Sequence, residues 1–285
     1  MNSKKIKLKQ NVELGQLTTL GIGGKAKYLF LVKNSAELSR LLKKIGNQFY
    51  ILGNGSNLLI KDILIKKPVI KLTDEFGLIK QKGNLLEVGS STLLSFLVKY
   101  CIEHHLEGIE NLAGIPATIG GMLSSAASSF GTNIFDCLEE VEVIDRKGSI
   151  YRLKKDEINY GYRYSSLRDL IIVKGYFNFS KEGKKIKEKI KNIVKKRIAL
   201  QDFSFPSCGS VFKNPASLAA GALVEQAGLS GKQKGDVKIS NKHANFILNL
   251  GRGSYSQADY LIKHVKEVIY QREGIILEEE VKRWS

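Results

Sequence analysis

The sequence predicts an α+β protein of about two domains. Its 285 residues, 43% of them apolar, are enough for a large buried core. Helical and strand patterns mix along the chain without the strict strand–helix alternation that a doubly wound parallel sheet requires. No internal repeat or low-complexity linker is visible. We therefore expect an α+β architecture.

The first half of the chain begins with an amphipathic pattern. Apolar residues at i, i+3, i+4 and i+7 predict a helix over 35–45, with Asn34 or Ser35 as its N-cap and Gly46 at its end. A strand over 49–52 should follow, and a short apolar strand over 58–60 comes after an intervening glycine-rich loop. These two strands bracket the first candidate binding loop.

Further helices and a hairpin are predicted along the chain. A helix is expected from about 91 to 105, and a hairpin joins 141–144 to 149–153. The lysine-rich stretch 180–201 has helical spacing and predicts a half-exposed helix between two domains. The last helix should run over 256–272, with Ser256 and Asp259 as a capping box and Gly274 at its end.

The charge balance is strongly basic, with 45 Lys and Arg against 28 Asp and Glu, a formal net charge of +17. Three explanations compete: compositional bias, nucleic-acid binding, and a pocket for polyanionic small molecules. The lysine-rich stretch has no aromatic residues on which bases could stack, which disfavours nucleic acid. Charge alone does not separate nucleic-acid binding from such a pocket.

Cysteine and histidine patterns point to a reducing compartment and to no metal. Cys101, Cys137 and Cys208 are odd in number and widely spaced, so they form no disulfide framework. The four histidines show no metal-ligand spacing. The basic N-terminus lacks the apolar stretch of a signal peptide, and no run of about 18 apolar residues appears. We expect a cytoplasmic protein with no membrane contact.

Three glycine-rich segments lie in the first half of the chain, at 18–24, 53–57 and 114–121. Glycines allow backbone N–H groups to approach phosphate oxygens closely, and Ser and Asn add side-chain donors. The 53–57 segment lacks the third glycine and the following helix of a Rossmann fingerprint. Each segment alone is also compatible with an ordinary turn. Together they favour a large phosphate-bearing ligand.

The second half supplies polar groups suited to chemistry. Tyr162-Arg163-Tyr164-Ser165 places a guanidinium where it can hold a carboxylate, or form a surface ion pair. The segment 209–215 puts Ser210 directly after a glycine, although a plain strand end is an alternative. Ser210 has no G-x-S-x-G context, so a hydrolase nucleophile is disfavoured. Further polar residues lie at 243–246 and 278–281.

In this order the segments resemble the UDP-N-acetylenolpyruvoylglucosamine reductase family over about residues 11–282. The resemblance rests on T-T-L-G-I-G-G, L-G-N-G-S-N-L-L, G-I-P-A-T-I-G-G, Y-R-Y-S, G-S-V-F-K-N-P, A-G-A-L-V-E-Q-A-G-L, S-N-K-H-A-N-F and L-E-E-E-V-K. The ordered set is highly specific, whereas no single piece is. The chain length is similar to that of the smaller subtype without the substrate-loop insertion.

The resemblance implies a two-lobed FAD-binding domain of the vanillyl-alcohol-oxidase (PCMH) type, over residues 1–180 with lobes of about 1–68 and 69–180. A linker helix and a smaller α+β substrate-binding domain would follow over 181–285. It implies bound FAD, NADPH as co-substrate and a UDP-linked amino-sugar enolpyruvyl ether as substrate, in peptidoglycan precursor synthesis. Independently of the resemblance, we expect a monomer, and no nucleic-acid partner because no binding motif or basic-aromatic platform is present. Another FAD-dependent oxidoreductase of this fold and, more remotely, a basic nucleic-acid-binding protein are the alternatives.

The family pattern assigns roles to individual residues. The implied catalytic residues are Arg163, Ser210 and Glu280, and the implied substrate contacts are Tyr162, Lys213 and Asn214. The implied cofactor contacts are Gly53, Asn54, Gly55, Ser56, Asn57, Gly114, Ile115, Pro116, Thr118, Gly120 and Gly121. In this scheme the guanidinium stabilises negative charge on the enol carboxylate, and the serine hydroxyl protonates carbon. The glutamate is either protonated or orients the arginine or a water.

The chain departs from the family pattern at three places. Ala117 stands where the family usually has glycine, and Lys282 replaces the usual arginine. More importantly, the stretch commonly found as M-N-A-G-A-Y-G is S-A-A-S-S-F-G at 125–131 here. An asparagine and a glycine near the flavin are thereby lost. We expect a changed flavin environment at this segment.

Overall fold

The computed structural model describes residues 6–181, 185–216 and 218–285. The chain folds into two compact units that alternate along the sequence. Unit 1 draws on residues 1–10, 28–54 and 67–196, and unit 2 on residues 11–27, 55–66 and 197–285. Each unit is therefore built from three separate stretches of chain.

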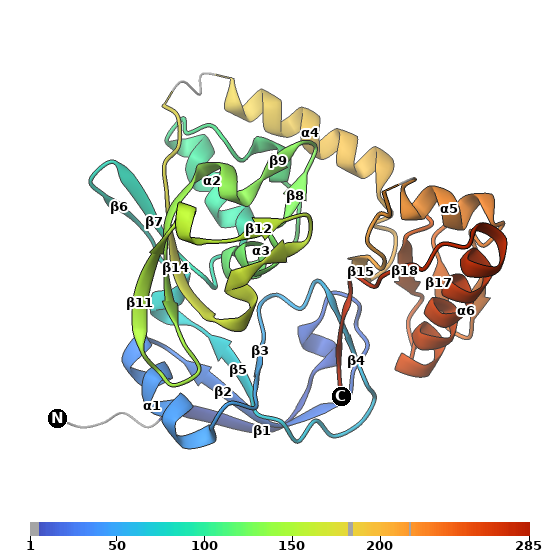
Figure 1. The fold of residues 1–285 in the computed structure, drawn as a ribbon, viewed down its shortest axis with the longest axis horizontal. Coiled ribbons are helices and arrows are strands. Elements are labelled where there is room, and N and C mark those ends of the chain that lie inside the picture. The colour runs from blue at the N-terminus through green and yellow to red at the C-terminus, as the bar shows by residue number, and fades with distance from the viewer. Residues whose placement is uncertain (1–5, 182–184, 217) are drawn as a thin grey trace. The chain divides into compact units, whose positions relative to one another are not determined.

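Two main sheets organise unit 1 (Figure 1). The first has the order β1-β2-β5-β3, in which β2, β5 and β3 run parallel. Its strands are β1 (Lys7–Glu13), β2 (Lys25–Val32), β3 (Tyr50–Ile51) and β5 (Val69–Leu72). The second is antiparallel, in the order β11-β10-β14-β7-β6. Its strands are β6 (Ile79–Lys82), β7 (Leu85–Gly89), β10 (Leu138–Ile144), β11 (Ile150–Lys154) and β14 (Ile171–Phe177).

The helices of unit 1 bury their apolar faces against these sheets. The amphipathic helix α1 packs its leucines on residues of the first sheet. The helices α2 and α3 form a larger core with β7, β10 and β14, to which the start of α4 contributes. These helices are α1 (Ser35–Ile45), α2 (Leu94–Glu103), α3 (Ile119–Ser125) and α4 (Ile186–Leu200). Two short hairpins are β8–β9 (Ser128–Ser129, Thr132–Asn133) and β12–β13 (Tyr160–Gly161, Tyr164–Ser165).

Unit 2 is a four-stranded antiparallel sheet packed against two helices. The strand order is β15-β18-β17-β16, and a separate parallel pair joins β4 to β19. The strands are β4 (Leu58–Ile60), β15 (Ser207–Ser210), β16 (Gln233–Lys234), β17 (Val237–Ile239), β18 (Phe246–Asn249) and β19 (Lys282–Trp284). The helices are α5 (Ala220–Gln226) and α6 (Tyr255–Glu273). One continuous apolar core holds the sheet and both helices together.

Most of the predicted elements are confirmed, with shifted ends. Asn34, not Ser35, caps α1: its Oδ1 accepts from the Glu37 N–H. The predicted helix from residue 91 begins only at Leu94, because residues 92–94 are extended or hydrogen-bonded to 117–119. The 141–144/149–153 hairpin is β10–β11, and the linker helix is α4, although residues 182–184 of its predicted range lie outside the described residues.

The predicted capping box of the last helix is wrong. Ser254, in extended conformation, is the N-cap, and its Oγ accepts from the Gln257 N–H while Gln257 Oε1 accepts from the Ser254 N–H. Ser256 lies inside the first turn, and Asp259 instead contacts Arg283. Gly274 ends the helix in the left-handed conformation, as expected.

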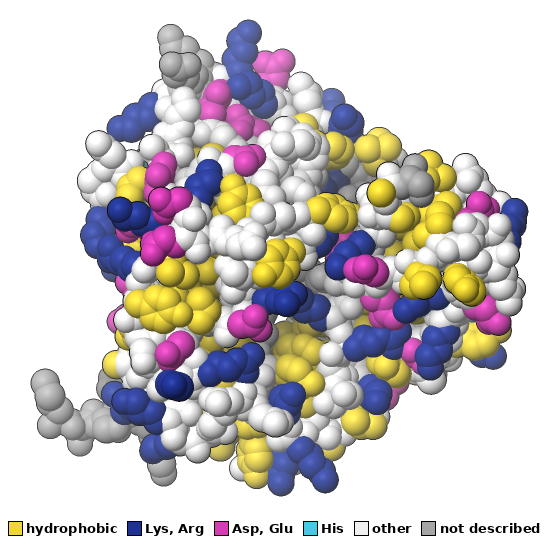
Figure 2. Space-filling model, viewed as in Figure 1, with side chains coloured by type: hydrophobic (Ala, Val, Ile, Leu, Met, Phe, Trp, Pro, Cys, Tyr) yellow, Lys and Arg dark blue, Asp and Glu magenta, His cyan; other side chains and the backbone are white. Residues whose placement is uncertain are grey.

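Two properties of the surface bear on function. Figure 2 shows Lys and Arg side chains interspersed with Asp and Glu on the face drawn, so the positive charge there does not gather into one basic stripe. Within residues 6–181, 185–216 and 218–285, no helix has the length and apolar character needed to cross a membrane. In the same residues no group of three or more His, Cys, Asp or Glu is arranged to hold a metal ion.

Candidate active site

Gly53 and Asn54, which begin the first glycine-rich loop, lie against the 114–121 loop within unit 1. Asn54 Nδ2 donates to the Pro116 carbonyl oxygen at 2.7 Å. A Cβ placed on Gly53 would stand 2.8 Å from Thr118 Oγ1, which is the N-cap oxygen of α3. Any larger residue at position 53 would therefore push the second loop away. The structure brings together loops that are more than sixty residues apart in sequence.

The loop over 53–57 offers hydrogen-bond donors. Within the described part of the chain, the backbone N–H groups of Gly53, Asn54, Gly55 and Ser56 make no hydrogen bond. Gly55 has φ +67°, and a Cβ on it would lie 2.3 Å from the Leu17 carbonyl oxygen. Only glycine fits both the conformation and the close packing. Consecutive backbone donors of this kind suit phosphate oxygens, and hence the pyrophosphate of FAD.

Ser90 and Thr92 pair with the second glycine-rich loop, and no sequence motif had pointed to them. The Ser90 and Thr92 carbonyls accept from the Gly120 and Ile119 N–H groups at 2.8 and 2.9 Å. Both side chains are buried, at 4% and 2% exposure, and among the described residues neither hydroxyl has a hydrogen-bond partner. Leaving a buried hydroxyl unsatisfied costs about 1–3 kcal/mol. The only sequence signal was the small polar run after a strand.

Arg163 contacts the segment that departs from the family pattern. Its Nη1 donates to Ser128 Oγ at 3.3 Å and to the Ser128 carbonyl oxygen at 3.4 Å. Arg163 has a left-handed backbone conformation, with φ +55°, in the turn between β12 and β13. Its guanidinium carbon lies 5.4 Å from the ring centre of Tyr162, which is itself 53% exposed. The serine that replaces the family glycine therefore helps to orient the guanidinium.

Ser210 and Glu280 lie on neighbouring segments of unit 2. The Glu280 N–H donates to the carbonyl oxygen of Val211, the residue after Ser210, at 2.8 Å. Asn57 holds the same segment: its Nδ2 donates to the Glu280 carbonyl oxygen at 3.1 Å, and its own carbonyl accepts from the Lys282 N–H at 3.0 Å. Asn57 Oδ1 is buried and has no partner among the described residues. Both Ser210 and Glu280 are half-buried.

Lys213 and Asn214 make local contacts in unit 2. Lys213 Nζ forms a 2.8 Å ion pair with Glu278, a largely exposed carboxylate whose pKa is lowered by this hydrogen bond. Asn214 Oδ1 accepts from the Ala220 N–H at 3.0 Å, at the start of α5. These contacts fix the two side chains next to the Ser210 strand.

Burial shifts the pKa values of two titratable groups near the Ser210 strand. It raises the pKa of the Cys208 thiol, two residues before Ser210, to about 12, so this cysteine stays a neutral thiol at physiological pH. Burial also lowers the pKa of His243, which favours the neutral imidazole. Neither group therefore adds charge near Ser210 at neutral pH.

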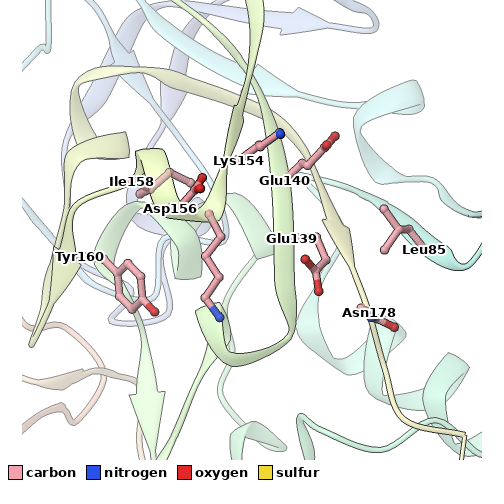
Figure 3. A pocket seen from close by; sticks show the side chains of 9 residues that line it. Leu85, Glu139, Glu140, Lys154, Asp156, Ile158, Tyr160 and Asn178 are labelled. Carbon is pink, nitrogen blue, oxygen red and sulfur yellow. The ribbon is translucent and has the colours of Figure 1, made fainter.

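A pocket of about 820 Å³ in unit 1 is lined by none of these residues. Figure 3 shows charged and polar side chains around it, contributed mainly by β10, the end of β11 and the segment after it. Its lining residues are Leu85, Glu139, Glu140, Lys154, Lys155, Asp156, Ile158, Tyr160 and Asn178. No residue that the sequence assigned to the site is among them, so this pocket is not the predicted site.

The predicted site residues thus form two groups. Unit 1 brings together Gly53, Asn54 and the 114–121 loop, and it also holds Arg163. Unit 2 brings together Asn57, Ser210 and Glu280. That Arg163 meets Ser210 and Glu280 at one flavin stays a prediction.

The fold and the loops define an FAD-binding oxidoreductase. A family model described as an FAD binding domain matches residues 26–154, and one described as the C-terminal domain of UDP-N-acetylenolpyruvoylglucosamine reductase matches residues 201–284. The predicted fold class is confirmed: an α+β chain whose FAD-binding domain is followed by a smaller C-terminal domain.

Relatives and one solved structure identify the family. The chain is 36% identical to a UDP-N-acetylenolpyruvoylglucosamine reductase of Aquifex aeolicus over 96% of this chain and 94% of that protein. It is 33% identical to the protein of the same name from Caldanaerobacter subterraneus over 98% and 94%. The crystal structure of the Thermus caldophilus reductase matches with a TM-score of 0.86, 33% identity and 99% coverage of both chains. The chain belongs to the UDP-N-acetylenolpyruvoylglucosamine reductase family.

Proposed function

We propose that this protein uses FAD and NADPH to reduce the enolpyruvyl ether of UDP-N-acetylglucosamine to UDP-N-acetylmuramate, in peptidoglycan precursor synthesis. The supporting observation is the pair of backbone segments in unit 2 that hold Ser210 and Glu280 next to each other, in a chain of this family. The cofactor contacts assigned above to the loops at 53–57 and 114–121 belong to the same proposal. The division into an FAD-binding domain over 1–180, and a linker helix with a substrate-binding domain over 181–285, also belongs to this proposal.

When bound, FAD would supply the redox chemistry, which is hydride transfer from NADPH and then hydride transfer to the enolpyruvyl double bond. The first transfer is the reductive half-reaction, and the second is the oxidative half-reaction. The protein supplies orientation, exclusion of water and one proton. The backbone donors at 53–56 would hold the pyrophosphate, and the packed loops leave no room for a larger residue at Gly53.

In the oxidative half-reaction negative charge builds up on the substrate carboxylate. The Arg163 guanidinium, oriented by Ser128, would stabilise this charge as a preorganised group. Ser210 Oγ would deliver the proton to carbon, and Glu280 would either be protonated or orient a neighbouring group. Tyr162, Lys213 and Asn214 would contact the nucleotide sugar.

The proposal extends to the cellular setting. The chain would act in the cytoplasm as a monomer, without a membrane or nucleic-acid partner. Cys101, Cys137 and Cys208 are free thiols, which is the usual state of cysteines in a reducing compartment and supports this setting.

Purified protein tests the proposal directly. We expect flavin absorbance in the protein as isolated, and NADPH oxidation that requires UDP-N-acetylglucosamine enolpyruvate. A protein without flavin would rule out the whole class. Flavin reduction by NADPH without any reoxidation by this substrate would indicate a different oxidoreductase of the same fold.

A further inference from the structure

Asn245 belongs to the polar segment just before β18, to which no function has yet been assigned. Its side chain is 3% exposed and pairs with both main-chain groups of Phe212. Asn245 Oδ1 accepts from the Phe212 N–H at 2.9 Å, and Asn245 Nδ2 donates to the Phe212 carbonyl oxygen at 2.9 Å. The side chain thus extends the ladder between β15 and β18, whose last pair is Ser210 with Phe246.

The opposite edge of the same segment pairs with residues 278–280, which precede β19. The Val211 carbonyl accepts from the Glu280 N–H at 2.8 Å, and the Lys213 N–H donates to the Glu278 carbonyl at 2.9 Å. Phe212 forms an isolated antiparallel bridge with Glu279. Residues 211–213 are therefore clamped between Asn245 on one edge and residues 278–280 on the other. All of these residues lie in unit 2.

An amide is the side chain that suits this place. It offers one acceptor and one donor group together, which match a peptide N–H and C=O. Phe212 is 2% exposed, so water does not replace a lost partner there. Loss of the amide would leave two buried main-chain groups unsatisfied and would free the segment to shift.

We propose that Asn245 is a positioning residue for the proton-transfer step: by fixing Phe212, it fixes Ser210 two residues before and the attachment point of Glu280. The proposal rests on the proposed function. Asn245 acts through the peptide groups of Phe212. Its removal should therefore slow the oxidative half-reaction more than it slows flavin reduction by NADPH.

The test is Asn245→Asp, which keeps the shape of the side chain. At neutral pH the carboxylate accepts from the Phe212 N–H but faces the Phe212 carbonyl without a proton to donate. We expect the oxidative half-reaction to slow on the order of 100-fold, as for small displacements of a reacting group. At lower pH the protonated carboxyl regains a donor, and the rate recovers toward that of the wild-type protein at the same pH. Stopped-flow flavin absorbance measures each half-reaction separately.

Asn249→Asp is the matched control. Asn249 is the last residue of β18, the strand that Asn245 precedes. Its side chain is also 3% exposed and pairs with main chain, but its partners are Leu20, Gly251 and Gly253. We expect it to lower the thermal midpoint while leaving the oxidative rate constant per bound flavin unchanged. Equal slowing by both variants, or no recovery of Asn245→Asp at low pH, would overturn the proposal.

A measurement on the wild-type protein covers the case in which Asn245→Asp does not fold. Amide hydrogen exchange of Phe212 should be slow and limited by opening of unit 2, whereas exchange at the rate of an exposed loop would contradict the clamp.

The proposed function and the proposed role of Asn245 would fail in different measurements. A wrong function is visible as missing substrate-dependent oxidation in the wild-type protein, and a wrong role for Asn245 only in the comparison of the two variants.

Discussion

Adding one methyl group to Gly53 tests whether the backbone around Gly53 and Thr118 forms a cofactor site. In Gly53→Ala the new Cβ would stand 2.8 Å from Thr118 Oγ1. This is several tenths of an ångström closer than ordinary contact, so the loops must separate. Overpacking of this kind costs about 1–3 kcal/mol. If the cost falls on the bound state, FAD affinity decreases about 5- to 150-fold, at 1.4 kcal/mol per tenfold.

A second substitution, Thr118→Ala, tests whether the Thr118 oxygen is the atom that the new methyl group meets. Thr118→Ala alone removes the N-cap oxygen of α3 and should cost about 1 kcal/mol of stability. In the Thr118→Ala background the methyl group introduced by Gly53→Ala no longer meets an oxygen, so Gly53→Ala should reduce FAD affinity less there than in the wild-type background. The double-mutant cycle should therefore give a favourable coupling energy of about 1–2 kcal/mol.

Flavin fluorescence titration of the apoprotein measures the dissociation constants, and thermal unfolding checks that each variant is folded. Gly161→Ala is the control, because nothing lies within 4 Å of its Cβ position and its φ is not in the left-handed region. Unchanged FAD affinity in Gly53→Ala, or an equal loss of affinity on adding Gly53→Ala to the wild-type and the Thr118→Ala backgrounds, would refute the packing of a cofactor cradle at these loops.

Three further predictions concern single residues. Ser210→Ala should leave flavin reduction by NADPH intact and slow reoxidation by the substrate, measured by stopped flow; equal slowing of both steps would exclude a proton donor. Ser128→Ala should slow reoxidation about 2- to 10-fold through loss of one hydrogen bond to Arg163, whereas Ser125→Ala, whose hydroxyl donates to the Gly121 carbonyl of its own helix, should not. The pKa of Asp259 is lowered because hydrogen bonds from Lys263 and Arg283 outweigh the effect of burial. Asp259→Asn should therefore lower the free energy of unfolding by about 1–3 kcal/mol at pH 7. This difference should shrink as the pH falls below the ordinary aspartate value of about 3.9 and through the lowered value; a difference that persists at low pH would contradict the assignment to charge.

Local structure was predicted well where short-range chemistry sets it. The helix over 35–45 and its caps follow from apolar spacing, Asn34 and Gly46, all within one segment. The N-cap of the last helix was predicted two residues too late, because Ser254 and Ser256 are both suitable capping residues by type. Only the extended backbone of Ser254 selects it.

Sequence motifs predicted which residues belong to the candidate site, but they did not predict the contacts of those residues in space. The motifs led to Gly53, Ser210 and Glu280, and the structure adds contacts that no spacing rule contains. Asn245 was visible only as part of a polar segment, since its pairing with Phe212 joins residues 33 positions apart. Ser90 became notable only when its hydroxyl was found buried without a partner among the described residues.

The amino-acid sequence by itself determined the α+β class, the order of the motifs and the family to which they belong. These depend on residue types and on periodicities within a few turns or strands. The tertiary structure alone decided that each unit is built from three separated stretches, that Gly53 packs on Thr118, and that Asn245 clamps the segment after Ser210. Such contacts between distant residues arise from burial and hydrogen-bond satisfaction summed over a whole unit, which no local pattern encodes.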